Sequence, residues 1–109
     1  MQKYRGLIKI RFWYSEALGP RSHTAGVSLS LSSQDSYEFV NAAQWTIADY
    51  SHAVEKGIKE GLLETGFDPE MGIKITLDAI DEDHIDSSEH AFYIAAKCAA
   101  KSRASMLRS

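Results

Sequence analysis

The chain has 109 residues, of which 44% are hydrophobic and 25% charged, and its formal net charge at pH 7 is −3. These values predict a single domain spanning 1–109, and they exclude a domain that holds nucleic acid by overall positive charge alone. No apolar run is long enough to cross a membrane. Charges interrupt the first apolar residues, so we expect a cytoplasmic protein without a signal peptide.

Two alternating segments open the chain. From Gly6 to Tyr14, isoleucines and aromatic residues point to one side, and a second set points to the other, namely Arg5, Leu7, Lys9, Arg11 and Trp13. Ser15–His23, which contains Gly19 and Pro20, predicts a long turn. From Ala25 to Ser32 apolar residues alternate with serines, so the two segments predict a β-hairpin.

A third strand and a helix follow. The strand is predicted over Tyr37–Gln44, with Phe39 in the core, and the helix over Asp49–Thr65, with Gly66 as its C-cap. Gly57 and Gly61 lie on the apolar stripe of this helix, where each costs roughly 1 kcal/mol relative to alanine. We therefore expect the two glycines to bring the helix close to the sheet.

The last unit consists of a strand over Gly72–Leu77 or a little beyond, an acidic loop, and a helix from Ser87 to about Ala104. Asp86 and Glu89 have the spacing of a capping box at the start of this helix. Its predicted buried face is mostly alanine, which allows close packing. The single cysteine of the chain, Cys98, lies among these alanines and is expected to be a small core residue in a reducing compartment.

The element order β-β-β-α-β-α predicts an α+β fold of two layers. In this arrangement a four-stranded sheet carries both helices on one face. The other face of the sheet is left open.

Four ordered segments resemble the fourth domain of translation elongation factor G. They are Tyr37–Ala42, Ala53–Ile58, Ile73–Leu77 and Asp86–Phe92. The resemblance implies a fold like domain 2 of ribosomal protein S5, with a left-handed strand-helix-strand crossover. It also implies two tip loops that touch tRNA and ribosomal RNA, which here correspond to Ser15–Thr24 and Asp78–Ile85.

The chain departs from that family in its loops. It lacks the glycine-rich phosphate loop with its Lys-Ser/Thr, so we expect no GTP binding. The family's first tip loop is glycine-rich and basic, whereas this one has Glu16 and a single arginine, Arg21. In the second tip loop, formed by Asp81, Glu82, Asp83 and His84, Asp83 stands where the family has a histidine. These carboxylates should repel phosphate backbones.

The second face of the first strand supplies the candidate RNA-binding residues. Basic side chains and one aromatic side chain alternate there, as in surfaces that contact phosphates and stack bases. The candidates are Arg5, Lys9, Arg11, Trp13, Arg21 and Lys74. Two other interpretations remain open: an ordinary solvated sheet face, or a face covered by a partner subunit.

Metal binding and catalysis are not expected. The carboxylates of the second tip loop offer oxygen ligands, but adjacent side chains cannot all point at one ion. The four histidines, His23, His52, His84 and His90, have no zinc-site spacing, and no nucleophile with a base can be assembled. We therefore expect a binding module without a cofactor.

Two functions remain open for such a module. The first is a translation accessory protein that binds the ribosome or structured RNA through the basic face of the first strand. The second is a protein–protein interaction module, including a homodimer, that kept the scaffold and lost the RNA contacts. No membrane partner is expected.

Overall fold

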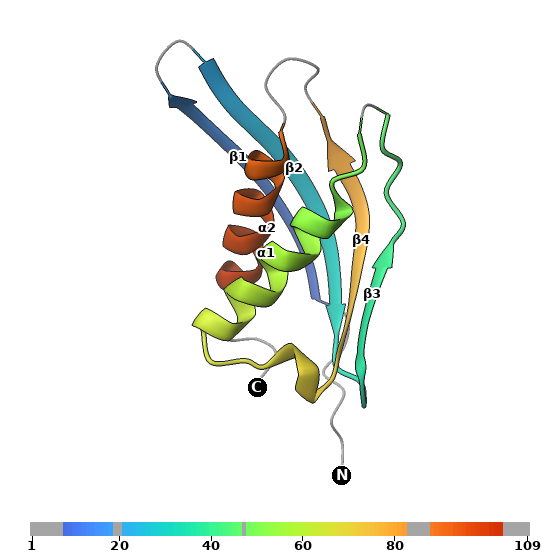
Figure 1. The fold of residues 1–109 in the computed structure, drawn as a ribbon. Helices are drawn as coiled ribbons and strands as arrows, with labels where there is room; N and C mark the ends of the chain where they lie inside the picture. The colour runs from blue at the N-terminus through green and yellow to red at the C-terminus, as the bar shows by residue number, and fades with distance from the viewer. Residues whose placement is uncertain (1–7, 19–20, 47, 83–87, 104–109) are drawn as a thin grey trace.

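The computed structural model describes residues 8–18, 21–46, 48–82 and 88–103, without the side chains of 16–18, 21–23 and 103. Its elements are β1 (Ile8–Leu18), β2 (Arg21–Ser32), β3 (Tyr37–Asn41), α1 (Ser51–Glu64), the 3-10 turn η1 (Pro69–Met71), β4 (Ile73–Asp81) and α2 (Glu89–Arg103). Both helices cover one face of the sheet and leave the other open (Figure 1). The predicted two-layer α+β fold is confirmed.

The sheet is mixed, with strand order β1-β2-β4-β3. β2 runs antiparallel to β1 and to β4, whereas β3 and β4 are parallel. With α1 in front of the sheet, β4 lies to the left of β3, so the β3-α1-β4 crossover is left-handed (Figure 1). This hand is rare among parallel crossovers and agrees with the expectation from the family resemblance.

The first hairpin is longer than predicted. Ser15–His23 was expected to be a turn, but β1 and β2 remain paired from Ile8↔Leu31 to Leu18↔Arg21. Backbone hydrogen bonds between paired strands do not depend on side-chain polarity, so a polar sequence can continue a ribbon beyond the core. β4 likewise continues past Leu77 to Asp81, whereas β3 ends at Asn41, three residues before the predicted end.

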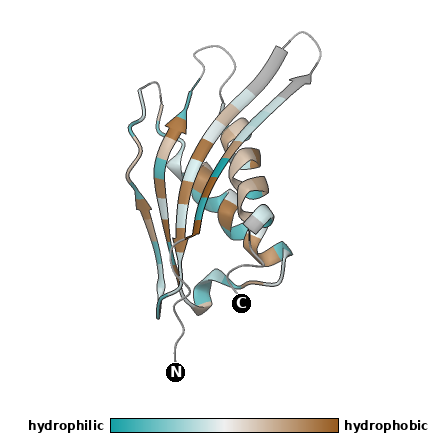
Figure 2. Cartoon of the chain, turned by 180° about the vertical axis from the view of Figure 1, so that it is seen from behind, coloured by the Kyte–Doolittle hydropathy of each residue, from teal (hydrophilic) through white to brown (hydrophobic). Residues whose placement is uncertain are grey.

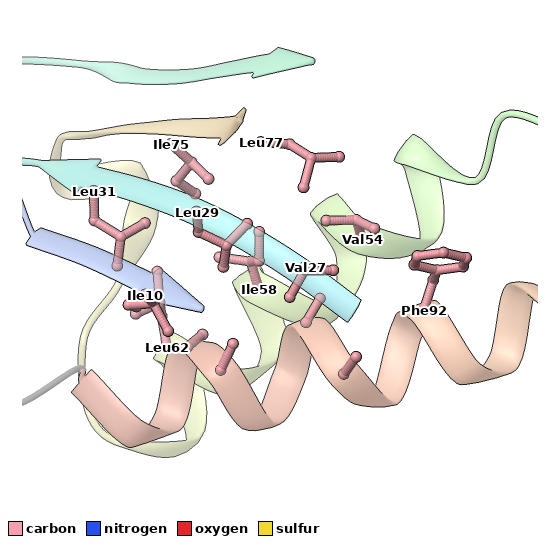
Figure 3. Packing of buried hydrophobic residues seen from close by; sticks show 14 of the residues in the cluster. Ile10, Val27, Leu29, Leu31, Val54, Ile58, Leu62, Ile75, Leu77 and Phe92 are labelled. Atoms are coloured by element: carbon pink, nitrogen blue, oxygen red, sulfur yellow. The ribbon is translucent and has the colours of Figure 1, made fainter. Parts of the chain in front are cut away.

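The core lies between the sheet and the two helices. Figure 3 shows the alternating leucines of β2 and the apolar residues of β4 turned toward Val54 and Ile58 of α1. Leu29, Leu31, Ile75 and Leu77 have at most 1% of their surface exposed. Phe39, expected in the core, packs against it and remains partly exposed.

α1 and α2 approach each other closely at the two glycines of α1. A Cβ on Gly57 would lie 2.4 Å from the carbonyl oxygen of Tyr93, and one on Gly61 would lie 2.6 Å from that of Lys97. The glycines therefore fit against α2, and the prediction that they approach the sheet was wrong. Because the contacts advance along both helices together, α1 and α2 run in the same direction (Figure 1).

Two tyrosines tie α1 to its neighbours by hydrogen bonds. The hydroxyl of Tyr37 on β3 donates to the Glu55 carboxylate, and that of Tyr93 on α2 donates to Glu60. Burial, followed by the bond to Glu55, raises the pKa of Tyr37. The bond to Glu60 raises the pKa of Tyr93. The hydrogen bonds of both tyrosines thus connect elements within the domain.

The helix ends show one confirmed prediction and one correction. Gly66 has a φ of 92°, and its N–H donates to the Leu63 carbonyl at 3.0 Å, so glycine ends α1 as predicted. At the start of α2 the Ser88 hydroxyl accepts from the Ala91 N–H at 3.1 Å. Ser88 therefore takes the capping role that was predicted for Asp86, which lies outside the described residues.

The prediction for Cys98 was also wrong, because its side chain is exposed. Ala95, Ala96, Ala99 and Ala100 are completely buried. Successive helical residues are rotated by about 100°, so this alanine stripe turns position 98 to the opposite side of α2.

Candidate nucleic-acid interface

The outward side of β1 carries a row of three large side chains. Ile8 and Ile10 are buried beneath the helices, and the alternation of the strand sends Lys9, Arg11 and Trp13 to the open face. Lys9 and Arg11 are exposed, and Trp13 keeps 54% of its surface exposed. Three of the six predicted RNA-binding residues therefore form one continuous stripe, which lies on the side of the sheet seen in Figure 2.

The neighbouring strand β2 offers only small residues to this face. In register, Lys9 pairs with Ser30, Arg11 with Ser28 and Trp13 with Gly26. Side chains this small leave open space beside the long side chains of the edge strand β1. A depression of about 490 Å³ lies here, and its lining includes Lys9, Arg11, Ser28 and Asp78.

The β4 side of the face is acidic. β4 has one extra residue opposite β2, because Leu29 pairs with Leu77 and Ser28 pairs with Ala79. The Ser30 hydroxyl donates to the carboxylate of this extra residue, Asp78. The open face therefore has a basic edge at β1 and carboxylates two strands away.

Lys74 lies apart from the basic stripe. It pairs with Ser32 on β2 and with Glu38 on β3, so the whole of strand β2 lies between it and β1. The side chains of Arg5 and Arg21 lie outside the described part of the chain. The structure therefore joins Lys9, Arg11 and Trp13 and leaves Lys74 as a separate charge beside a glutamate.

The second tip loop begins later than the sequence predicted. Asp81 is still part of β4 and pairs with Gly26, and its side chain is exposed. The Glu82 carboxylate accepts from the Thr46 hydroxyl at 2.6 Å and from the Thr46 N–H at 3.2 Å. Asp83 and His84 are outside the described residues. Glu82 thus holds the connection after β3 against the end of β4.

Gly26 is a functional candidate that the sequence analysis missed. It is buried although it lies on the open face, because neighbouring side chains cover it. A Cβ at this position would lie 2.9 Å from Cε3 of Trp13 and 2.8 Å from Oδ2 of Asp81. A glycine inside a strand is itself a signal of close approach, and that signal was available in the sequence.

A second hollow of about 490 Å³ lies on the helix layer, between the first turns of α1 and α2. Its lining includes Lys56, Glu89, His90 and Tyr93. Lys56 Nζ lies 5.7 Å from the centre of the Tyr93 ring, and the Tyr93 hydroxyl is bonded to Glu60. Because these groups already contact each other, the open sheet face is the stronger candidate for binding.

Within the described ranges, no three histidine, cysteine, aspartate or glutamate side chains gather as a metal site would require. No helix among these residues is long and apolar enough to span a membrane.

Comparison with known proteins gives a structural relative and no family. No family model and no curated protein matches the chain. The chain is similar to part of a protein from Thermus thermophilus known by its crystal structure, ttk003000868, with 27% identity and a TM-score of 0.79. The similarity covers 92% of this chain and only 16% of the Thermus chain. The same architecture thus occurs as one segment of a much longer polypeptide.

Proposed function

We propose that this protein is a cytoplasmic, non-catalytic binding module, similar to the fourth domain of elongation factor G, that engages ribosomal or other structured RNA. The observation that carries the proposal is the exposed stripe of Lys9, Arg11 and Trp13 on the open sheet face. Two cations can contact phosphates, and an exposed indole can stack on a base. The left-handed crossover and the relation to one segment of a long Thermus chain are consistent with the family resemblance.

The spacing along β1 supports single-stranded or looped RNA as the ligand. Alternate residues of a strand lie roughly 7 Å apart, so successive positions of the stripe follow an extended backbone. RNA loops can turn their bases outward, whereas the bases of a regular duplex are stacked inside it. The small residues of β2 leave room for such a segment beside the cations.

The test is cosedimentation of the purified protein with bacterial ribosomes at several salt concentrations. The wild type is expected to bind with strong salt dependence, and Lys9→Glu/Arg11→Glu is expected to weaken binding strongly at every salt concentration. For single-stranded RNA, loss of two phosphate contacts should flatten the log–log salt slope by roughly 1.4. Lys56→Glu/Lys101→Glu is the matched control, because it makes the same charge change on the helix layer.

Two results would contradict the proposal. One is absence of ribosome binding by the wild type even at low salt. The other is equal loss of binding in the sheet-face variant and the helix-layer control, which would show that only net charge matters.

The mixed charge of the open face favours a second candidate, a protein partner. Asp78 and Asp81 on β4 and Glu38 on β3 share this face with the basic stripe, and a protein surface can match both signs. In that case Asp78→Asn or Asp81→Asn should weaken binding, and RNase treatment of the ribosomes should leave binding intact.

A further inference from the structure

One row of the open face places an aromatic ring beside a carboxylate. Trp13, Gly26 and Asp81 are in register across β1, β2 and β4. Cε3 of Trp13 and Oδ2 of Asp81 lie 2.9 and 2.8 Å from the same point above Gly26. The edge of the indole is thus in the immediate neighbourhood of the carboxylate, and no side chain rises between them.

Both groups are available to a ligand. Trp13 is 54% exposed, the most of any described tryptophan, tyrosine or phenylalanine. Asp81 is exposed, and the described residues give its carboxylate no hydrogen bond or ion pair. The contrast with Glu82 is direct, because Glu82 accepts two hydrogen bonds from Thr46.

A carboxylate on an RNA-binding face needs a role other than phosphate contact, because it repels phosphates. An ionised aspartate has two acceptor oxygens and no donor. Guanine presents two adjacent donors, N1–H and the N2 amino group, on its Watson–Crick edge. Adenine presents one donor and one acceptor there, cytosine presents one donor and two acceptors, and uracil presents one donor between two acceptors. A carboxylate can therefore accept two parallel hydrogen bonds only from guanine.

We propose that Trp13 and Asp81 form a pocket for an unpaired guanine base, with the ring stacked on the indole and its N1–H and N2 amino group donating to the carboxylate. Gly26 makes the pocket possible, because any side chain there would force the two groups apart. Arg11, two residues before Trp13 on the same face, is placed for a phosphate of the same strand. This inference rests on the proposed RNA-binding function and adds a base preference to it.

The test measures binding of three fluorescein-labelled RNA pentanucleotides by anisotropy at low salt. Each has uridines flanking a central guanosine, inosine or adenosine. The guanosine RNA is expected to bind about tenfold more tightly than the adenosine RNA, within the range of discrimination by one bidentate contact. Inosine lacks the N2 amino group, so the inosine RNA should bind with intermediate affinity.

Two variants separate the base contact from general binding. Asp81→Asn replaces one acceptor by a donor and should reduce the preference for guanosine to less than about twofold. Glu89→Gln is the matched control, because it removes the same charge at an exposed position of the helix layer, away from the open sheet face. It should leave the preference unchanged. Trp13→Ala should weaken binding of all three RNAs, because stacking is available to every base.

The possible outcomes distinguish the guanine pocket from the proposed RNA-binding function on which it rests. Equal affinity for the three RNAs, or an unchanged preference in Asp81→Asn, would overturn the guanine pocket and leave RNA binding intact. Absence of binding to all three RNAs would overturn the pocket. If the wild type also failed to cosediment with ribosomes, the proposed RNA-binding function would be overturned too.

Discussion

The two surfaces of the sheet differ in how their side chains are used. On the covered side, Phe92 is completely buried and the glycines of α1 fit against the backbone of α2. Even the polar groups there connect elements, as the Tyr37–Glu55 and Tyr93–Glu60 hydrogen bonds show. On the open side, a tryptophan, two cations and a carboxylate stand exposed above a row of small residues. The side chains on the covered side therefore stabilise the fold, whereas those on the open side are exposed and accessible to a ligand.

The largest expected effect contrasts one aromatic residue from each side. Phe92 packs against Trp45 in a T-shaped arrangement, with ring centres 5.0 Å apart, and has no exposed surface. Phe92→Ala should reduce the free energy of unfolding by about 3–5 kcal/mol, because it leaves a cavity in the core. Trp13→Ala should change it by less than about 1 kcal/mol. Urea unfolding of both variants measures the difference, and similar losses would contradict the division between the two sides.

The next largest effect concerns the contact between the helices. Gly57→Ala adds a methyl group 2.4 Å from the Tyr93 carbonyl oxygen, so α1 must move away from α2. We expect a loss of about 1–3 kcal/mol in the free energy of unfolding, despite the better helix propensity of alanine. Leu63→Ala, at an exposed position of the same helix, is the control and should stay within about 0.5 kcal/mol. Stabilisation by Gly57→Ala would show that the helices do not need the glycine.

The smallest effect is a pH dependence on the helix layer. Hydrogen bonds from Lys97, at 2.7 Å, and from Lys101, at 3.2 Å, lower the pKa of Glu64 below its ordinary value of 4.5. A lowered folded-state pKa contributes stability above the ordinary value, and this contribution is lost as pH falls through the folded-state pKa. The stability difference between wild type and Glu64→Gln should therefore shrink from pH 7 to pH 3. Urea unfolding at both values measures it, and a pH-independent difference would refute the pairing.

Much of the fold followed from local patterns. Period-two alternation in Ala25–Ser32 and in Ile73–Leu77 identified two strands and their buried faces, because each residue of a strand faces opposite its neighbour. Gly66 marked the end of α1, because glycine tolerates the positive φ that this ending requires. The outward direction of Lys9, Arg11 and Trp13 followed from the same alternation.

Pairing between distant segments decided the rest. The sequence did not reveal that Gly57 and Gly61 meet α2 rather than the sheet. A glycine on the apolar stripe of a helix indicates a close neighbour, but it does not indicate which element that neighbour is. The sequence analysis placed Asp81 in a loop, because a run of acidic residues is typical of turns. Its pairing with Gly26 on β2 cannot be read from the local sequence. The juxtaposition of Trp13 and Asp81 over Gly26 depends on the registers of β1 with β2 and of β2 with β4. Such registers are set by long-range packing, so only the tertiary structure could bring these three residues together.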